Sequence, residues 1–104
     1  MSLPKMTQGV ATAARVTLFP NLPNPFSLET VLAFRVCGVQ SWRLRIVDRR
    51  GRTVRVFRGH NSGVVTLVWH GDDLAGSLVP DGVYYAELDA GVGTVRRRLI
   101  LMRQ

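Results

Sequence analysis

Apolar and polar residues alternate in short segments along most of the chain, and residues 42–48 show this pattern most clearly. Trp42, Leu44 and Ile46 fall on one side of an extended strand, whereas Arg43 and Arg45 fall on the other. Side chains of a β-strand point alternately to the two faces of its sheet, so a period of two indicates a strand buried on one face. The pattern therefore predicts a strand with an apolar inner face and an arginine-bearing outer face.

Six further segments are also predicted to be strands, and turn-forming residues separate them. Gly51 follows a run of basic residues and predicts a tight turn, because glycine readily adopts the positive φ that such turns need. The proline-rich segment 20–25 is expected to be extended, and residues 59–63 to form a polar loop. Short strands at regular spacing predict an all-β fold, an immunoglobulin-like antiparallel β-sandwich of about seven strands. The predicted strands are residues 16–19, 30–36, 42–48, 53–58, 65–70, 83–88 and 94–103.

Residues 65–88 are expected to organise this sandwich. Two apolar segments flank a loop rich in glycine and aspartate, and each segment contributes a large aromatic side chain, Trp69 and Tyr84. Aromatic side chains bury large areas, and a buried tyrosine needs a hydrogen-bond partner for its hydroxyl group. We therefore expect the rest of the core to pack against Trp69 and Tyr84.

The length and charge of the chain define its size class and the chemistry of its partners. A chain of 104 residues can hold one domain with its own core, which the pattern places at residues 16–104. Residues 1–15 show no amphipathic face and are predicted to be a flexible linker or leader. The 14 basic and 7 acidic residues give a net charge of +7. This charge favours anionic partners such as nucleic acid, lipid head groups or acidic polysaccharide.

The sequence contains no recognisable targeting or membrane-spanning segment. No apolar run approaches the roughly 20 residues that a spanning helix needs. Residues 1–14 carry one charge and small polar side chains, and they lack the apolar centre of a signal peptide. The chain is therefore expected to be either an internal protein or a fragment of a longer one.

The residues that could carry catalysis do not form a recognisable set. His60 and His70 are the only possible bases for a nucleophilic hydroxyl or thiol, and both are expected to be surface residues. Cys37, the only cysteine, is expected to be a small buried side chain, with an intermolecular disulfide as the alternative. No glycine-rich loop opens a helix, as a phosphate site would require. We therefore predict no enzymatic activity and no bound cofactor.

Three carboxylates flank the central loop and could in principle bind a cation. Asp72, Asp73 and Asp81 are the residue types that hard cations prefer. Their spacing, however, does not match a calcium-binding loop. Aspartate side chains also stabilise turns by accepting hydrogen bonds from nearby backbone amides. The favoured interpretation is such a turn, and no metal site is predicted.

Arginine accounts for nearly all of the positive charge. Nucleic-acid binding would need aromatic side chains among the arginines, and Phe57 is the only outward aromatic candidate near them. Nucleic acid is therefore not a favoured partner. A solvated face that protects the edge strands is favoured over a specific anion site, which stays open as the alternative. The arginines concerned are Arg35, Arg43, Arg45, Arg55, Arg96, Arg97, Arg98 and Arg103.

Four motifs, in order, and the terminal strand that follows them resemble those of one family of bacterial domains. The family comprises the C-terminal immunoglobulin-like sorting domains of type IX secretion cargo, together with the similar domain of the flagellar hook-capping protein. The resemblance covers residues from about 18 to 103, nearly the whole predicted domain. The motifs are Phe-Pro-Asn-Leu-Pro-Asn-Pro-Phe-Ser at 19–27, the Asp-Arg-Arg-Gly-Arg hairpin within 46–54, Trp-His-Gly-Asp-Asp-Leu-Ala-Gly at 69–76, Val-Pro-Asp-Gly-Val-Tyr-Tyr at 79–85, and the basic, then apolar, strand at 94–103.

The resemblance implies a non-catalytic sorting and anchoring domain at the end of an exported bacterial protein, located outside the cell or on its surface. In this family the domain is recognised by an outer-membrane secretion apparatus. Arg96, Arg98 and Arg103 match basic positions of the last strand, and they are the candidate contacts with that apparatus. The other matched positions are expected to have structural roles: Pro25, Phe26, Gly51, Trp69, Gly82 and Tyr84.

A second function from a different class stays open. The chain is alternatively a structural protein-interaction module, either hook-cap-like or an accessory domain beside an extracellular enzyme. Both functions imply a protein partner, namely secretion or assembly machinery. An anionic cell-surface glycolipid is a further possible partner, and neither function implies a membrane span.

Overall fold

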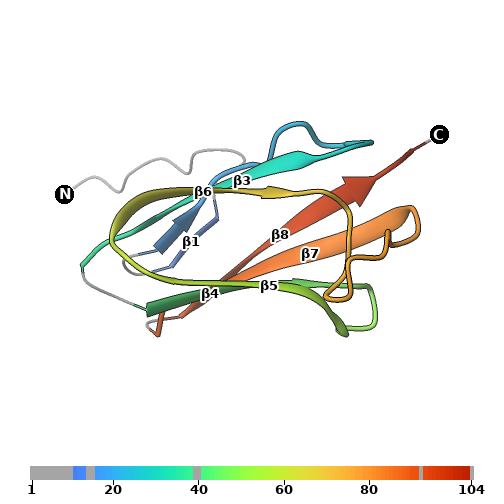
Figure 1. Ribbon diagram of the computed structural model, residues 1–104. Helices are drawn as coiled ribbons and strands as arrows, with labels where there is room; N and C mark the ends of the chain where they lie inside the picture. Colours follow the sequence, from blue (N-terminus) through green and yellow to red (C-terminus); the bar gives the residue numbers. More distant parts are fainter. Residues whose placement is uncertain (1–10, 14–15, 39–40, 92, 104) are drawn as a thin grey trace.

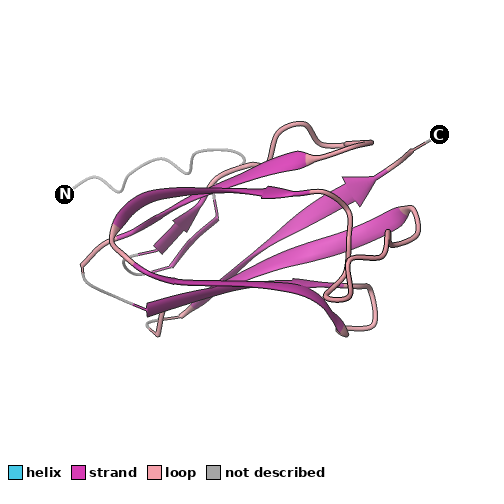
Figure 2. Cartoon of the chain, viewed as in Figure 1, coloured by secondary structure: helices cyan, strands magenta, loops and turns pink. Residues whose placement is uncertain are grey.

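The computed structural model describes residues 11–13, 16–38, 41–91 and 93–103, and these residues form eight β-strands and no helix (Figures 1 and 2). The all-β prediction is therefore confirmed. The described part also has no helix long and apolar enough to cross a bilayer. The strands are β1 (Ala11–Ala13), β2 (Val16–Leu18), β3 (Thr30–Val36), β4 (Ser41–Val47), β5 (Thr53–His60), β6 (Gly63–Trp69), β7 (Gly82–Asp89) and β8 (Thr94–Leu101).

The strands form two sheets that pack face to face. One sheet has the order β1-β2-β3-β6 and the other has the order β5-β4-β7-β8, and every neighbouring pair is antiparallel. Figure 1 shows the chain arching from β5 in one sheet to β6 in the other. This architecture confirms the predicted antiparallel β-sandwich.

The seven strands from β2 to β8 have the connectivity of an immunoglobulin domain. In that fold strands A, B and E share one sheet, and strands C, F and G share the other, to which C′ adds at the edge. Strands β2, β3 and β6 take the first set of places, and β5, β4, β7 and β8 take C′, C, F and G. Trp42 lies on β4, where many immunoglobulin domains bury a tryptophan.

Strand boundaries agree with the alternation to within about two residues except around residue 60. Residues 59–63 were expected to form a loop, but β5 continues to His60 and β6 begins at Gly63. Gly59 is a strand residue because it faces Trp42 across the ladder. A Cβ atom at Gly59 would lie 2.2 Å from Cζ2 of that indole ring. The glycine thus provides space for the tryptophan, and only Asn61 and Ser62 connect the two strands.

The predicted linker, residues 1–15, includes a strand that was not expected. Ala11–Ala13 forms β1, which pairs with β2 in the register Ala11↔Leu18. The remaining residues of that segment, 1–10 and 14–15, lie outside the described part. Small residues without an apolar pattern gave no strand signal, because β1 is defined by backbone pairing to its neighbour.

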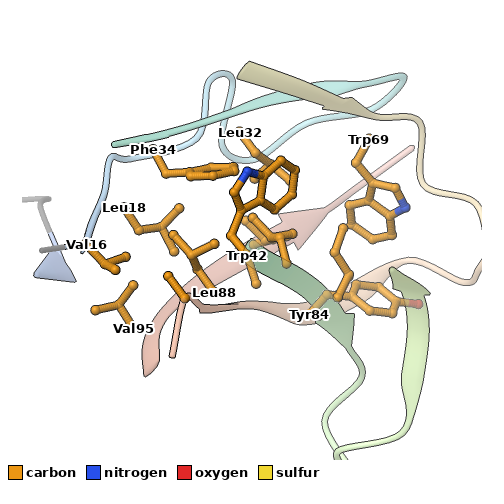
Figure 3. Close-up of a cluster of buried hydrophobic side chains, with 14 of the residues drawn as sticks. Val16, Leu18, Leu32, Phe34, Trp42, Trp69, Tyr84, Leu88 and Val95 are labelled. Carbon is orange, nitrogen blue, oxygen red and sulfur yellow. The ribbon is translucent and has the colours of Figure 1, made fainter. Parts of the chain in front are cut away.

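The core fills the space between the sheets, and Trp69 and Tyr84 pack against each other at one end of it (Figure 3). Their rings are 5.4 Å apart and nearly perpendicular, at 72°. The ring of Phe26 also packs against Trp69, with the ring centres 5.4 Å apart. Phe34 meets the edge of Trp42 at 4.9 Å. Trp69 and Tyr84 are thus both in the core, as predicted, together with Phe26. The expectation that the rest of the core packs against this pair holds at one end only, because Phe34 and Trp42 form a separate aromatic contact (Figure 3).

Three expectations about exposure are wrong. Cys37 is exposed rather than buried, because it follows the last buried residue of β3, Val36, and alternation turns it outward. Phe57 is half-buried against the core, since it lies opposite Leu44 on the inner side of β5. Arg55 lies on that same inner side rather than on a polar outer face, with its guanidinium 4.8 Å from the centre of the Phe57 ring.

Candidate recognition surface

The outer face of the β5-β4-β7-β8 sheet carries a row of charged side chains. The strand register places Arg43 opposite Asp89, and Glu87 between Arg45 and Arg96. Their sequence neighbours, such as Leu44 and Leu88, point inward and are buried. The prediction that Arg43 and Arg45 face outward is confirmed.

Glu87 stands at the centre of this row and contacts two arginines. Its Oε1 accepts a hydrogen bond from Nη2 of Arg45 at 2.7 Å, and its Oε2 lies 3.6 Å from Nε of Arg96. The Arg96 guanidinium also stacks on the ring of Tyr85, 3.9 Å from its centre, a cation–π contact. One carboxylate thus holds two guanidinium groups in place, and the group of three keeps a net positive charge.

The exposed Arg98 lies beside a segment that covers the edge of β8. Asn24 Nδ2 donates to the Arg98 carbonyl oxygen at 3.3 Å, and Asn24 Oδ1 accepts from the Ile100 amide at 2.9 Å. The Asn24 side chain thereby replaces the backbone groups of a missing neighbour strand. An open concavity of about 490 Å³ lies here, and its lining consists of Asn24, Tyr85, Arg96, Arg97 and Arg98.

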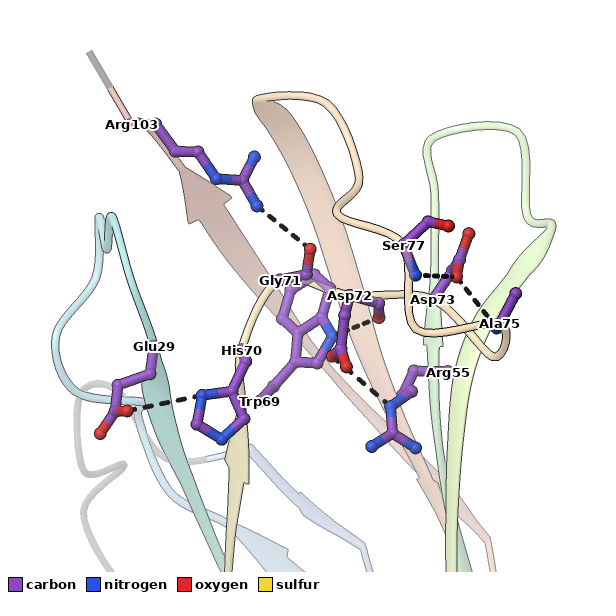
Figure 4. A network of polar contacts seen from close by, with 10 residues as sticks. All are labelled: Glu29, Arg55, Trp69, His70, Gly71, Asp72, Asp73, Ala75, Ser77 and Arg103. Carbon is purple, nitrogen blue, oxygen red and sulfur yellow. Dashed lines mark hydrogen bonds and ion pairs between the residues drawn. The ribbon is translucent and has the colours of Figure 1, made fainter.

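Arg103, the third candidate contact, binds backbone and side-chain oxygens of its own domain. Its Nη1 donates to the carbonyl oxygen of Val79 at 2.5 Å, and its Nη2 donates to that of Gly71 at 3.1 Å (Figure 4). Asp81 accepts from both the amide and the guanidinium of Arg103, at 2.9 and 3.3 Å. Arg96 and Arg98 therefore lie on the outer face, whereas the Arg103 side chain joins the end of the chain to the loop after β6.

The other two predicted aspartates, Asp72 and Asp73, stabilise the loop after β6 in different ways. Asp73 Oδ1 accepts from the amides of Ala75 and Ser77, both at 2.9 Å, which confirms the favoured turn. Asp72 lies 3.6 Å from Arg55, and its carbonyl oxygen accepts from the Trp69 indole at 2.9 Å. No group of three or more side chains suited to a metal ion occurs in the described part of the chain.

The positions predicted to be structural lie at the same end of the sandwich or next to it. The Tyr84 hydroxyl donates to the carbonyl oxygen of Pro80 at 2.6 Å, the arrangement called a tyrosine corner in immunoglobulin domains. Burial raises the pKa of the Tyr84 hydroxyl above its usual value. Gly51 has φ of 84° in the β4–β5 turn. Gly82 begins β7, and Pro25 precedes Phe26 in the segment beside β8.

A serine and a histidine meet at the opposite strand ends. Ser41 Oγ and His60 Nδ1 are 2.8 Å apart, the distance expected of a nucleophile and its base. Both residues are exposed, and no carboxylate among the described residues orients the imidazole. His70 is exposed as well and lies 3.5 Å from Glu29.

Sequence reasoning did not single out Tyr85, Glu87 or Asn24 as site residues. The alternation within residues 83–88 could have identified the first two, because Tyr84 points inward and its neighbours at odd positions point outward. Asn24 gave no such signal, since its partners on β8 lie more than 70 positions away in the sequence.

No protein-family model matches the chain, and no curated protein matches its sequence. Solved structures with a similar fold include the two described next. PorU from Porphyromonas gingivalis, in a dimeric latent form, gives a TM-score of 0.66 at 16% identity, over 86% of this chain and 9% of that chain. FlgD from P. aeruginosa gives a TM-score of 0.58 at 18% identity, over 86% of this chain and 71% of that chain. This chain thus spans less than a tenth of PorU.

The likeness at these identities shows the fold alone. It places the chain in the class of immunoglobulin-like β-sandwich modules, as the strand order does. One of the two similar structures forms a small part of a much longer protein, and the other has a length comparable to this domain.

Proposed function

We propose that this chain is a non-catalytic sorting and anchoring domain of an exported bacterial protein, recognised through the outer face of β7 and β8. The observation that carries the proposal is that Arg96 and Arg98 are exposed on β8, next to Tyr85 of β7. The ordered motifs that resemble those of type IX secretion cargo support it, and so does the likeness to a domain of PorU. The partner is the secretion apparatus, and the domain acts outside the cell or at its surface.

The chemistry of this face suits an acidic partner. Arginine guanidinium groups bind carboxylates through two parallel hydrogen bonds, and Tyr85 already holds one guanidinium in a fixed position. An acidic protein surface is the proposed ligand, and an anionic cell-surface glycolipid offers the same charged groups. We propose no catalysis, because Ser41 and His60 lack an orienting group among the described residues.

The experiment fuses the domain to a fluorescent passenger behind a signal peptide, in a bacterium with a type IX apparatus. The double variant Arg96→Ala/Arg98→Ala should leave most of the passenger in the periplasm. The matched control is Arg49→Ala/Arg50→Ala, which removes the same charge from the exposed β4–β5 turn and should be secreted normally.

Secretion of the Arg96→Ala/Arg98→Ala variant at the wild-type level would contradict recognition through this face. Thermal unfolding of the purified variants shows whether both pairs leave the fold intact. Binding of the domain to vesicles with and without anionic glycolipid then separates the two sources of negative charge.

A second candidate function is a structural module in an extracellular or flagellar assembly. The observation that favours it is the likeness to FlgD, which covers most of both chains. In this case binding of a partner protein, rather than export of the domain, should depend on Arg96 and Arg98. Co-purification of an assembly component with the wild-type domain, lost in the double variant while export continues, would favour this function.

A further inference from the structure

The sandwich has four edge strands, and three of them have features that discourage pairing with another chain. The edge of β8 is covered by residues 24–26, with backbone hydrogen bonds between Phe26 and both Ile100 and Met102. Strand β1 has only three residues. Strand β5 carries arginines, and its ladder to β4 contains an irregularity at Ile46 and Val47. Short, charged, covered or irregular edges are the usual protections of natural sheets.

Strand β6 is the fourth edge, and within the described part of the chain it has none of these protections. Its seven residues, Gly63–Trp69, include no charge and no proline. Among the described residues it pairs with β3 only. A long, uncharged edge strand presents unpaired amide and carbonyl groups, which can extend a sheet by pairing with a further strand.

The hydrogen bonds of β3 show which backbone amides and carbonyls of β6 point away from β3. Val31 exchanges backbone hydrogen bonds with Leu22, at 2.8 and 3.2 Å, on the side of β3 away from β6. Backbone groups alternate in direction along a strand, so Leu32 must bond toward β6, where it lies opposite Leu67. The same alternation along β6 turns the amides and carbonyls of residues 64, 66 and 68 to the open edge.

The side chains of these residues face the outer surface of the β1-β2-β3-β6 sheet. Val64 is 58% exposed and Val68 is 40% exposed. On the neighbouring strand Val31 is 38% exposed, and Leu22 beside it is 69% exposed. The open edge therefore borders an apolar strip at Val68, whereas the exposed Arg35 lies opposite Val64.

We propose that β6 pairs with β6 of a second copy of this chain, antiparallel, about a two-fold axis at Thr66. The outward residues Val64, Thr66 and Val68 are symmetric about that position. The axis would place Val64 opposite Val68 of the second copy and the two Thr66 residues opposite each other. Each of these three positions has free backbone groups, so each pair can exchange two hydrogen bonds.

Charge favours a second copy at this edge over the outer face of the β5-β4-β7-β8 sheet. The chain carries a net charge of +7, and the arginine-bearing outer face of the other sheet would repel a like-charged copy. Strand β6 is uncharged, so pairing there brings no like charges into direct contact along the two strands. In a two-fold contact each copy contributes its own β6 edge, so no free β6 edge remains and the assembly stops at a dimer. This self-association does not depend on the proposed function.

Sedimentation equilibrium of the purified chain over a range of concentrations tests the dimer. Thr66→Pro removes an amide that faces the open edge, so the bonds to β3 stay intact while two intermolecular bonds are lost. We expect dimer dissociation to become at least about tenfold more favourable. Thr66→Lys places two like charges at the axis and should act in the same direction even if the proline variant folds poorly. Thr94→Lys, an exposed threonine on β8, is the matched control and should leave the dimer unchanged.

A disulfide test then reports the register. Cys37 is exposed and is first replaced by Cys37→Ser. In that background Thr66→Cys should form a covalent dimer on mild oxidation, because facing Cα atoms of an antiparallel hydrogen-bonded pair lie about 5.5 Å apart, within disulfide range. Val64→Cys should not, because its two copies would lie about 13 Å apart along the strands.

A chain that stays monomeric at all concentrations would overturn the proposal. So would a dimer that Thr66→Pro and Thr66→Lys leave unchanged, assemblies larger than a dimer, or equal cross-linking at positions 64 and 66. A dimer lost in both Thr66 variants, kept in Thr94→Lys and cross-linked through position 66 would support it.

Discussion

Arginine has two different roles in this domain, one at the loop end of the sandwich and one on the outer face of β7 and β8. At the loop end, Arg103 donates to the carbonyl oxygens of Gly71 and Val79, and its side chain is 27% exposed. On the outer face, Arg96 contacts Glu87 and Tyr85 and is 55% exposed. The same residue type, near the start of β8 and just beyond its end, therefore is available to a partner in one place and holds the fold in the other.

The difference follows from the groups that each guanidinium contacts and from how far those groups are buried. Buried carbonyl oxygens need hydrogen-bond donors, and a charged donor contributes about 1.5 to 3 kcal/mol. An exposed ion pair contributes about 0 to 1 kcal/mol, because water solvates both groups well when they are apart. Substitutions at the loop end should therefore change stability, and substitutions on the outer face should change binding.

The largest effect is expected for Arg103→Ala. It removes the donor to Val79 and the ion pair with Asp81, and it should lower the free energy of unfolding by about 2 to 3 kcal/mol. Arg98→Ala, within β8 and exposed, is the control and should change it by less than about 0.5 kcal/mol. Urea denaturation of both variants measures the difference. Equal effects would show that the two arginines do not differ as the geometry indicates.

Arg103→Lys sharpens the same comparison. Lysine keeps the charge but cannot place two planar donors on separate carbonyl oxygens. It should recover only part of the stability lost in Arg103→Ala. Full recovery would show that charge near Asp81, rather than the two carbonyl contacts, stabilises the loop.

The second effect concerns Tyr84→Phe, which removes the hydroxyl bonded to Pro80 and keeps the ring beside Trp69. Loss of one hydrogen bond should lower stability by about 1 kcal/mol. Because burial raises the pKa of Tyr84 above 10.0, the folded state favours the protonated hydroxyl. That contribution is complete below pH 10 and is lost as the pH rises through the folded-state value. Tyr84→Phe should lack this part of the fall in the free energy of unfolding at alkaline pH. Denaturation at several pH values measures the difference.

The features that the sequence alone predicts are local ones. Alternation identified β3 and β4 and the inward aromatic residues, because a period of two follows directly from strand geometry. Tyr84 was expected to need a hydroxyl partner, and that partner is the Pro80 carbonyl oxygen. These features depend on residues close in sequence or on the pattern of a single strand.

Features that join distant segments were not predictable in this way. Asn24 bonds to β8 across more than 70 residues, and nothing in its own segment specifies that partner. The resemblance placed Arg103 with Arg96 as a basic position, but only the structure shows the carbonyl oxygens around it. Strand β1 exists through its pairing with β2 and has no side-chain signal of its own.

A smaller effect on stability, with a larger one on binding, is expected for Glu87→Gln on the outer face. It weakens the contacts that neutralise Arg45 and Arg96, so stability should fall by about 0.5 kcal/mol. The freed guanidinium groups should bind polyanions more tightly, and the variant should elute from heparin at higher salt. Glu29→Gln makes the same charge change beside His70 and is the control. Equal shifts in the two variants would attribute the effect to net charge rather than to this face.

The smallest effect is expected at the β4–β5 turn, near the loop end, where Asp48 accepts hydrogen bonds from the amides of Arg50 and Arg52. These bonds, foremost the Arg52 amide, hold the pKa of Asp48 below its ordinary value of 3.8. The folded turn therefore favours the ionised carboxylate, so its contribution is complete above that value and is lost as the pH falls through the lower folded-state pKa. In an NMR titration, the Arg50 and Arg52 amide signals should shift with a midpoint below pH 3.8. Asp48→Asn should abolish that shift, and an unchanged shift would assign it to another carboxylate. Because these hydrogen bonds lie within the β4–β5 turn, the turn should open locally while Trp69 and Tyr84 keep the core intact.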